Sequence, residues 1–293
     1  MTNTAATKQP GKRFPISKIF IYLGLSLWAV TTIFPFLWVI VNSFKPNRLI
    51  RTQAFSLPFG DAFTMENYTV ALQRVDIGVA YRNSIVISGV VTVVVMLLAG
   101  MASYGLVRYK FPGKRILQSL VVASMMFPVF STIIPVFRME YAWGIANTGK
   151  VFLSQLSVIL PQIAGNLSFA IVILSGYIRS LPVDMEEAAF LEGYSAPQIF
   201  LRIIMPLSRP SFATVGIFTF LWSYNDLFTQ MFFLRSKKVF TITRLLNEIS
   251  SQAGVNYGLM VAAVVMVVVP VLIVYIFLQN HIIKGMTAGA IKG

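Results

Sequence analysis

The stretch LPVDMEEAAFLEGYSAPQIFLRIIMPLSRP, residues 181–210, is charged, has a helical pattern and lies between two long apolar segments. Asp184 and Glu187 have the spacing of a capping box, so a first helix is expected to begin at Asp184. Gly193 can end this helix in the left-handed conformation that glycine adopts without strain. The first half of the stretch therefore predicts a short helix followed by a glycine corner.

The second half of the stretch predicts another short helix. Ser195, with Gln198 three residues later, can cap its start, and Pro197 is tolerated in its first turn. Pro206 is expected to end it. Both helices are too short to cross a bilayer, so the stretch predicts a helix–corner–helix element outside the membrane.

One side of the first helix carries two alanines, and two interpretations of this side stay open. Spacings of three and four place Met185, Ala188, Ala189 and Glu192 together. Alanines on such a side allow close approach by a partner. Alternatively, the element is an amphipathic linker that lies on the membrane surface.

The composition is that of a membrane protein. Of the 293 residues, 56% are hydrophobic and 12% are charged, and the mean hydropathy is +0.74. A soluble domain carries about 25% charged residues. We therefore expect an all-α polytopic membrane protein, whose net charge of +14 suits anionic lipid rather than nucleic acid.

Several kinds of site are excluded. The chain has no cysteine and one histidine, His281, which excludes disulfides, cysteine metal sites and multi-histidine metal sites. We predict no metal site and no cofactor in this chain. It also lacks the glycine-rich GxxxxGK[ST] loop that binds nucleotide phosphates, so any ATP must be bound by another polypeptide.

Six apolar runs are near the ~20 residues that cross a bilayer as a helix. We expect a basic N-terminal segment 1–18, a first span 19–41, a long loop 42–83, a core 84–280 with five spans, and a tail 281–293. The five core spans are expected at 85–107, 116–137, 156–178, 212–234 and 259–278, with the helix–corner–helix element between spans 4 and 5.

The basic residues suggest an orientation. Arg108, Lys110, Lys114 and Arg115 follow the second span directly, and such clusters stay on the cytoplasmic side. We therefore expect both termini and the 181–210 element in the cytoplasm. The loops on the other side are net basic, which suits either lipid head groups or an anionic solute.

The 181–210 element resembles the EAA loop that marks permease subunits of bacterial ABC importers. The motif spacing is long and ordered, and the sequence departs from it at Met205, where the family usually has Leu. The resemblance implies a cytoplasmic coupling element that contacts a separate ATPase. The matching positions are Glu187, Ala188, Ala189, Gly193, Ile203, Met205 and Pro206.

The C-terminal sequence QNHIIKGMTAGAIKG, residues 279–293, resembles the tail of carbohydrate ABC permeases, specifically the six-span partner of the maltose-type pair. This resemblance implies a bacterial inner-membrane location and a non-enzymatic subunit. It also implies a second homologous permease, two ATPase copies that bind ATP and Mg, and an extracytoplasmic solute-binding protein.

Polar residues inside the spans are candidates for a solute path. The sequence Trp222-Ser-Tyr224-Asn225-Asp226 resembles a stretch of sugar-importer permeases, and an ionisable residue at membrane depth is a functional candidate. Gln162 and Asn166 share a helical face. They either line the path or bridge helices inside the bundle.

The loop between the last two spans, residues 235–257, enters the cleft of the binding protein in the resembled family. The residues expected near its tip are Ser250, Ser251, Gly254 and Asn256.

Two alternatives stay open. The chain could serve an ABC importer of another solute class, or be a self-contained secondary transporter. The latter class carries midplane carboxylates or broken helices, and neither is evident in the sequence. Within the carbohydrate reading, the net-basic outer loops suit an acidic oligosaccharide.

Overall fold

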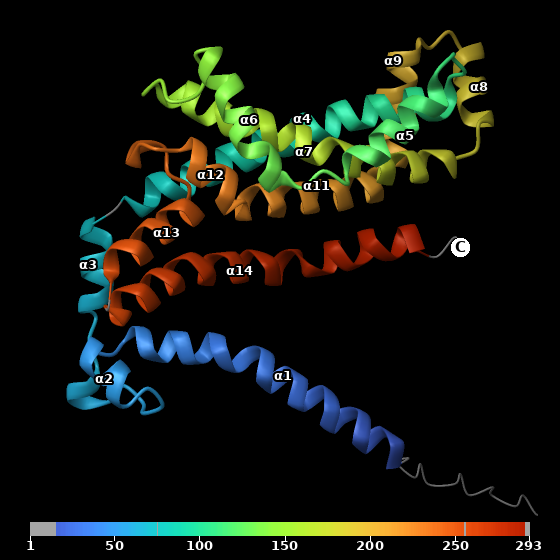
Figure 1. Cartoon of the computed structure of the whole chain (residues 1–293). Coiled ribbons are helices and arrows are strands. Elements are labelled where there is room, and N and C mark those ends of the chain that lie inside the picture. The colour runs from blue at the N-terminus through green and yellow to red at the C-terminus, as the bar shows by residue number, and fades with distance from the viewer. Residues whose placement is uncertain (1–15, 75, 255, 291–293) are drawn as a thin grey trace, which may run out of the picture.

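The structure is a computed structural model that describes residues 16–74, 76–254 and 256–290. Every regular element in these ranges is helical, as the sequence predicts (Figure 1). The first half comprises α1 Ile16–Ser43, α2 Asn47–Thr52, η1 Gly60–Ala62, α3 Glu66–Arg74, α4 Ile77–Arg108, α5 Lys114–Ser124, α6 Val129–Ala142 and α7 Val151–Arg179. The second half comprises α8 Asp184–Leu191, α9 Ala196–Ile199, the π-helical turn η2 Phe200–Ile204, α10 Met205–Leu207, α11 Arg209–Asn225, α12 Leu227–Phe233, η3 Lys237–Val239, α13 Ile242–Ala253 and α14 Tyr257–Ala290.

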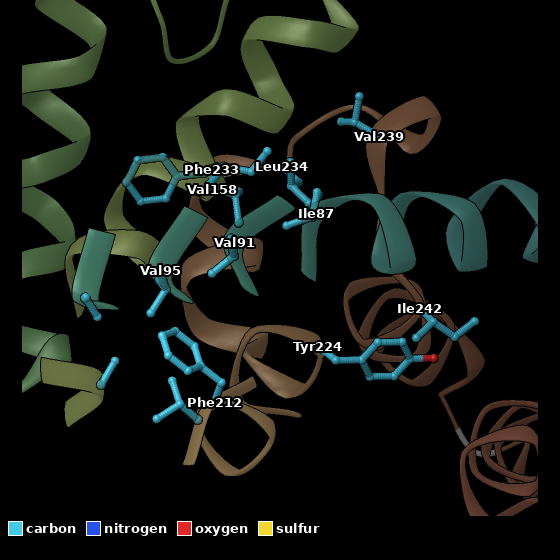
Figure 2. Packing of buried hydrophobic residues seen from close by; sticks show 14 of the residues in the cluster. Ile87, Val91, Val95, Val158, Phe212, Tyr224, Phe233, Leu234, Val239 and Ile242 are labelled. Carbon is cyan, nitrogen blue, oxygen red and sulfur yellow. The ribbon is translucent and has the colours of Figure 1, made fainter. Parts of the chain in front are cut away.

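The core is built on α4, which packs along α7 and α11. Ile87, Val91 and Val95 repeat every four residues and are fully buried, so they form one continuous apolar stripe (Figure 2). Where α4 crosses α11, Gly100 allows the aromatic ring of Phe212 to approach. A Cβ atom at Gly100 would lie only 2.8 Å from that ring.

Three described helices are long and apolar enough to cross a membrane by themselves: α1 from Lys18 onward, α4 and α7. Two bent pairs raise the total to five if each pair is one span. The apolar helix α14 follows these, and the count of six spans stays a prediction.

The prediction of a continuous third span over 116–137 is wrong. The chain breaks between Ser124 and Val129, and α5 and α6 meet at 102°. Pro128 is the N-cap of α6, and its missing N–H would remove a hydrogen bond from a helix that continued through this position. Broken helices are therefore present, which removes one argument made from the sequence against a secondary transporter.

The predicted fifth span over 212–234 is also interrupted. Helix α11 ends at Asn225, and Asp226 caps the new helix α12. The apolar run continues across this point, so hydropathy alone did not reveal the break.

The segment 42–83, expected as a loop, is a folded unit that contains α2, α3 and the first turns of α4. Lys45 is fully buried, and its Nζ donates to the carbonyls of Gln53 (3.1 Å) and Ala54 (3.2 Å). Burial lowers the pKa of this ammonium group. Asn67 donates to the carbonyls of Ser43 (2.9 Å) and Lys45 (2.8 Å), so α3 satisfies the end of α1.

The two ends of the sequence lie largely outside the described residues. Residues 1–15 of the predicted N-terminal segment and the side chains of the tail motif 279–293 are among them. The backbone of α14 continues to Ala290, so helix extends into the segment 281–293 that was expected to be a tail.

Replacing Gly100 with Ala should destabilise the crossing of α4 and α11, because the added methyl group overlaps the Phe212 ring. Overpacking of this kind costs ~1–3 kcal/mol. Thermal unfolding of the detergent-solubilised chain should show a lower midpoint. The control is Gly89→Ala on the same helix, where nothing lies within 4 Å of the added atom. Equal midpoints for the two variants would contradict the close crossing.

Candidate functional site

The glycine corner between α8 and α9 forms as predicted. Gly193 has φ +88°, a left-handed conformation that favours glycine, and a Cβ atom at this position would meet nothing within 4 Å. The constraint at Gly193 is therefore one of backbone conformation alone.

The predicted capping box of α8 is wrong. The N-cap residue is Val183, and no side chain caps the helix. Asp184 already belongs to the first turn, where its carboxylate interacts favourably with the helix dipole instead of accepting a capping bond. Glu187 is exposed.

The start of the second helix follows the sequence prediction, but its end does not. The N–H of Ser195 donates to Oε1 of Gln198 at 2.8 Å. The helix then continues through η2 and past Pro206, which lies in the first turn of α10, where its missing N–H costs little. The chain turns at Ser208 instead, and the segments on either side of this turn meet at 82°.

The two alanines of the motif have different environments. Ala189 is 5% exposed and belongs to the buried cluster that contains Ile199 and Phe200. Ala188 is exposed. The expectation that both alanines face a partner is therefore wrong for Ala189, because its side chain packs inside this chain.

The outward side of α8 carries large apolar side chains. Phe190 is 71% exposed and Leu191 is 88% exposed. Met185 lies on the same short helix and is also exposed. Of the remaining motif positions, Ile203, Met205 and Pro206 are half-buried.

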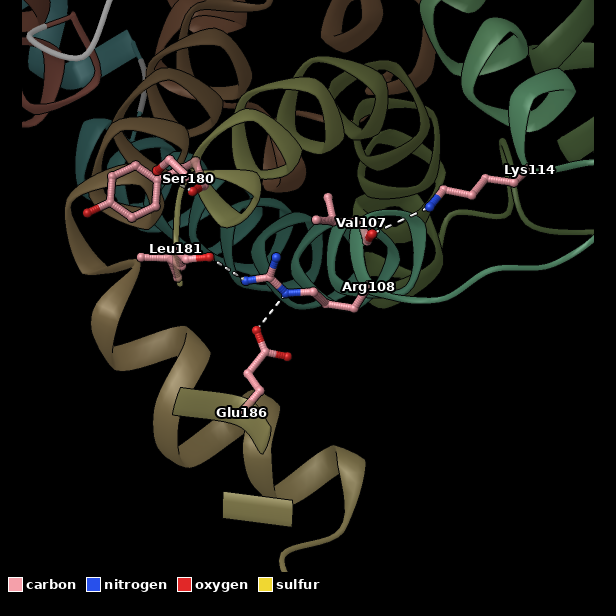
Figure 3. A network of polar contacts seen from close by, with 7 residues as sticks. Val107, Arg108, Lys114, Ser180, Leu181 and Glu186 are labelled. Atoms are coloured by element: carbon pink, nitrogen blue, oxygen red, sulfur yellow. Dashed lines mark hydrogen bonds and ion pairs between the residues drawn. The ribbon is translucent and has the colours of Figure 1, made fainter. Parts of the chain in front are cut away.

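An ion pair that the sequence analysis did not predict joins α8 to the end of α4 (Figure 3). Nε of Arg108 lies 2.5 Å from Oε1 of Glu186, and both side chains are largely buried. Nη2 of Arg108 also donates to the carbonyl of Leu181 at 3.0 Å. The helix–corner–helix element is therefore fixed to the core helix by a charge-assisted bond.

At the other end of the bundle, Gln162 of α7 reaches the break between α11 and α12. Its Oε1 accepts from the hydroxyl of Ser223 at 2.6 Å, and its Nε2 donates to Oδ2 of Asp226 at 2.9 Å. Asn166 donates to the carbonyl of Gln162 at 2.7 Å. The side chain of Gln162 therefore joins α7 to the end of α11, which favours the bridging interpretation for Gln162. The bond of Asn166 stays within α7.

Asp226 also fixes the start of α12, because its Oδ1 accepts from the N–H of Thr229 at 3.1 Å. The two neighbouring candidate residues differ in burial. Tyr224 is buried, whereas Asn225 is exposed and donates to the carbonyl of Leu221 at 2.9 Å. The structure thus brings together Gln162 and Asp226, and a role of these residues in a solute path stays a prediction.

A second amide, Gln230 of α12, is buried and was not predicted as a site residue. Its Nε2 donates to the carbonyl of Ser223 at 2.9 Å, and its Oε1 accepts from the hydroxyls of Thr241 and Thr243. It therefore fixes the chain that enters α13 to the end of α11.

The same chain is also held from α4. The buried Asn83 donates to the carbonyls of Lys238 and Phe240, each at 3.1 Å, and accepts from Nε2 of Gln155 at 3.2 Å. The hydroxyl of Ser84 accepts from the N–H of Ile242 at 2.8 Å. We call the segment 237–243 the outer segment.

The predicted loop 235–257 consists largely of the amphipathic helix α13, which packs on α4, α12 and α14. Ser251 and Gly254 are exposed, and Ser250 is half-buried. Asn256 accepts from the N–H of Leu259 at 3.1 Å and so caps the start of α14. Contact of these four residues with a binding protein stays a prediction.

Comparisons with known proteins agree with this architecture. The family described as "Binding-protein-dependent transport system inner membrane component" matches residues 95–287. The diacetylchitobiose uptake system permease protein NgcG of Streptomyces coelicolor is 35% identical, over 92% of this chain and 87% of its own length. The trehalose transport system permease protein SugB of Mycobacterium tuberculosis is 31% identical, over 88% of this chain and 92% of its own length.

Among solved structures, a bacterial ABC transporter that imports the acidic polysaccharide alginate contains a similar chain. The TM-score is 0.76 at 20% identity, over 94% of this chain and 99% of that one. At this identity, the likeness establishes the fold.

Replacing Asp226 with Ala should destabilise the break between α11 and α12. The change removes the cap of α12, worth about 0.5–2 kcal/mol, and leaves the Nε2 group of Gln162 without its acceptor on Asp226. The midpoint of thermal unfolding in detergent should fall. The control is Asp61→Ala, at an exposed position in η1. If both variants unfold at the same temperature, the assigned capping role is wrong.

Proposed function

The chain belongs to the family of binding-protein-dependent transport system inner membrane components, and on this premise we propose that it is a permease subunit of an ATP-driven carbohydrate importer. In this proposal the chain forms one part of the path through the membrane. Hydrolysis of ATP takes place on a separate ATPase, so the chain itself is not an enzyme.

The observation that carries the coupling proposal is the outward side of α8. Phe190 and Leu191 present apolar surface on a short helix that ends at a glycine corner and is fixed to α4 through Glu186. Large exposed apolar residues rimmed by charged ones are typical of protein–protein contacts. We assign this side of α8, with Glu187 and Ala188, to contact with the ATPase.

The carbohydrate class is supported by the relatives named above. The similar proteins NgcG and SugB are a diacetylchitobiose uptake permease and a trehalose transport permease. We extend this class of solute to the present chain. Whether the solute is neutral or acidic is left to the uptake experiment, since the likeness to the alginate transporter concerns the fold.

The proposed partners are a second homologous permease, two copies of an ATPase that bind ATP and Mg, an extracytoplasmic solute-binding protein and membrane lipid. A similar chain occurs in an alginate transporter solved in complex with its periplasmic protein, with a TM-score of 0.66. We place the assembly in the bacterial inner membrane, with both termini cytoplasmic. Nucleic acid has no role in this proposal.

The proposal is tested by uptake into proteoliposomes that contain the full transporter and ATP. Wild type should accumulate labelled oligosaccharide only with ATP and the binding protein. Leu191→Asp should lose the copurifying ATPase and the uptake, because a carboxylate would replace the apolar contact. The control is Leu72→Asp, at an exposed leucine on α3.

In that experiment, unlabelled neutral and acidic oligosaccharides compete with the labelled one, which identifies the solute class. Wild-type uptake by Leu191→Asp would exclude the outward side of α8 as the ATPase contact. Uptake of amino acids but not of oligosaccharides would overturn the carbohydrate assignment.

The orientation gives a separate prediction. The chain has no native cysteine, so single cysteines report accessibility without background. Arg115→Cys, beside the basic turn that precedes α5, should resist an impermeant thiol reagent in intact cells, whereas Asp61→Cys should react. Both positions are exposed in the structure. Reaction of Arg115→Cys alone would reverse the orientation and contradict the coupling proposal.

A further inference from the structure

We propose that α4 is the helix through which the outer segment controls the position of α8. The positioning residues are Asn83, near the start of α4, and Glu186 of α8, which binds its last residue. This inference rests on the proposed function, in which a binding protein acts at the outer side and an ATPase at α8. It assigns roles to two contacts that the sequence motifs do not include.

At one end, α4 holds the outer segment by its backbone. Asn83 binds the carbonyls of Lys238 and Phe240, and Ser84 binds the N–H of Ile242. All of these bonds lie in or beside the short connection, residues 240 and 241, between η3 and α13. A shift of the outer segment therefore acts directly on the first turns of α4.

At the other end, Arg108 is the last residue of α4 and binds both α8 and the segment that precedes it. Its guanidinium contacts the carboxylate of Glu186 and the carbonyl of Leu181, which precedes α8. A planar guanidinium with two separate acceptors fixes direction as well as distance. A shift of α4 therefore changes the place that α8 can occupy.

Between these ends, α4 is one uninterrupted helix without proline. Asn83 and Arg108 are 25 residues apart in it, which corresponds to about 37 Å. The buried stripe of Ile87, Val91 and Val95 and the bond from Ser103 to the carbonyl of Ile171 (3.1 Å) hold it against its neighbours. Such a packed helix moves as a unit.

Another connection runs along α11, and it is interrupted at two places. Helix α11 breaks at Asp226 on the outer side, and at Ser208 it meets the preceding segment at 82°. The π-helical turn η2 lies just before that bend. Displacement along this route is partly absorbed where the chain bends. The continuous helix α4 is therefore a more direct connection between the outer segment and α8 than α11.

A double-mutant cycle on the reconstituted transporter tests the inference. The variants are Asn83→Ala, Glu186→Gln and the combination. The measured quantity is ATPase activity with loaded binding protein divided by activity without it. Each single change should lower this ratio, and a coupling of the usual size predicts a loss of about fivefold or more.

The combination decides between the two cases. If α4 transmits the signal, the second change removes a connection that is already broken. The ATPase ratio of the double variant should then be no lower than that of the more impaired single variant. Independent roles would make the losses multiply. The matched control pairs Asn67→Ala with Glu186→Gln, because Asn67 is a buried amide at the same side that binds the carbonyls of Ser43 and Lys45 rather than α4. Any loss from Asn67→Ala should multiply with that from Glu186→Gln.

A stability measurement separates signalling from structure. Thermal unfolding effects of Asn83→Ala and Glu186→Gln should add, since the sites are far apart and share no partner. Glu186→Asp, which keeps the charge, should restore part of the ATPase ratio lost in Glu186→Gln.

A wild-type ratio of one would refute the proposed function itself. Stimulated wild type with multiplying losses would overturn only the role of α4.

Discussion

A break in a helix at membrane depth exposes backbone N–H and C=O groups, and hydrocarbon offers them no partner. Several buried polar side chains of this chain supply hydrogen-bond partners for such groups. Asp226 caps α12 at the break after α11, and Gln230 binds the carbonyl of Ser223 beside it. Buried carbonyls outside the spans have the same need: Asn83 binds those of Lys238 and Phe240, and Asn67 binds those of Ser43 and Lys45. Buried amides suit this task because each both donates and accepts.

The sequence could predict the features that depend on residues close together in the chain. Local signals predicted the glycine corner at Gly193 and the bond from Ser195 to Gln198, because both depend on residues within one turn. Apolar composition predicted the helical membrane fold. The break at Asp226 lies inside a continuous apolar run, so hydropathy gave no sign of it. The ion pair of Arg108 and Glu186 joins residues 78 apart in the chain, and no periodic pattern relates such positions.

The same difference between local signals and contacts of distant residues applies to the candidate site. The motif identified the short helix that carries the site, but it could not assign inward and outward sides. Ala189 packs on the core while Phe190 and Leu191, which the motif does not include, are the most exposed apolar side chains of α8. Likewise, Gln162 and Asp226 were recognised as polar residues in apolar spans. Only their mutual bond shows that their polar groups are used inside the bundle.

Helix α1 differs from the rest of the chain. In the part of the chain that the structure describes, no residue of its most apolar window is buried. It lies against α14 through residues near its end such as Val39 and Ile40. The family match begins at residue 95, beyond α1. A change in the sequence of α1 that suits the lipid or protein beside it would therefore leave the packing of α4, α7 and α11 intact.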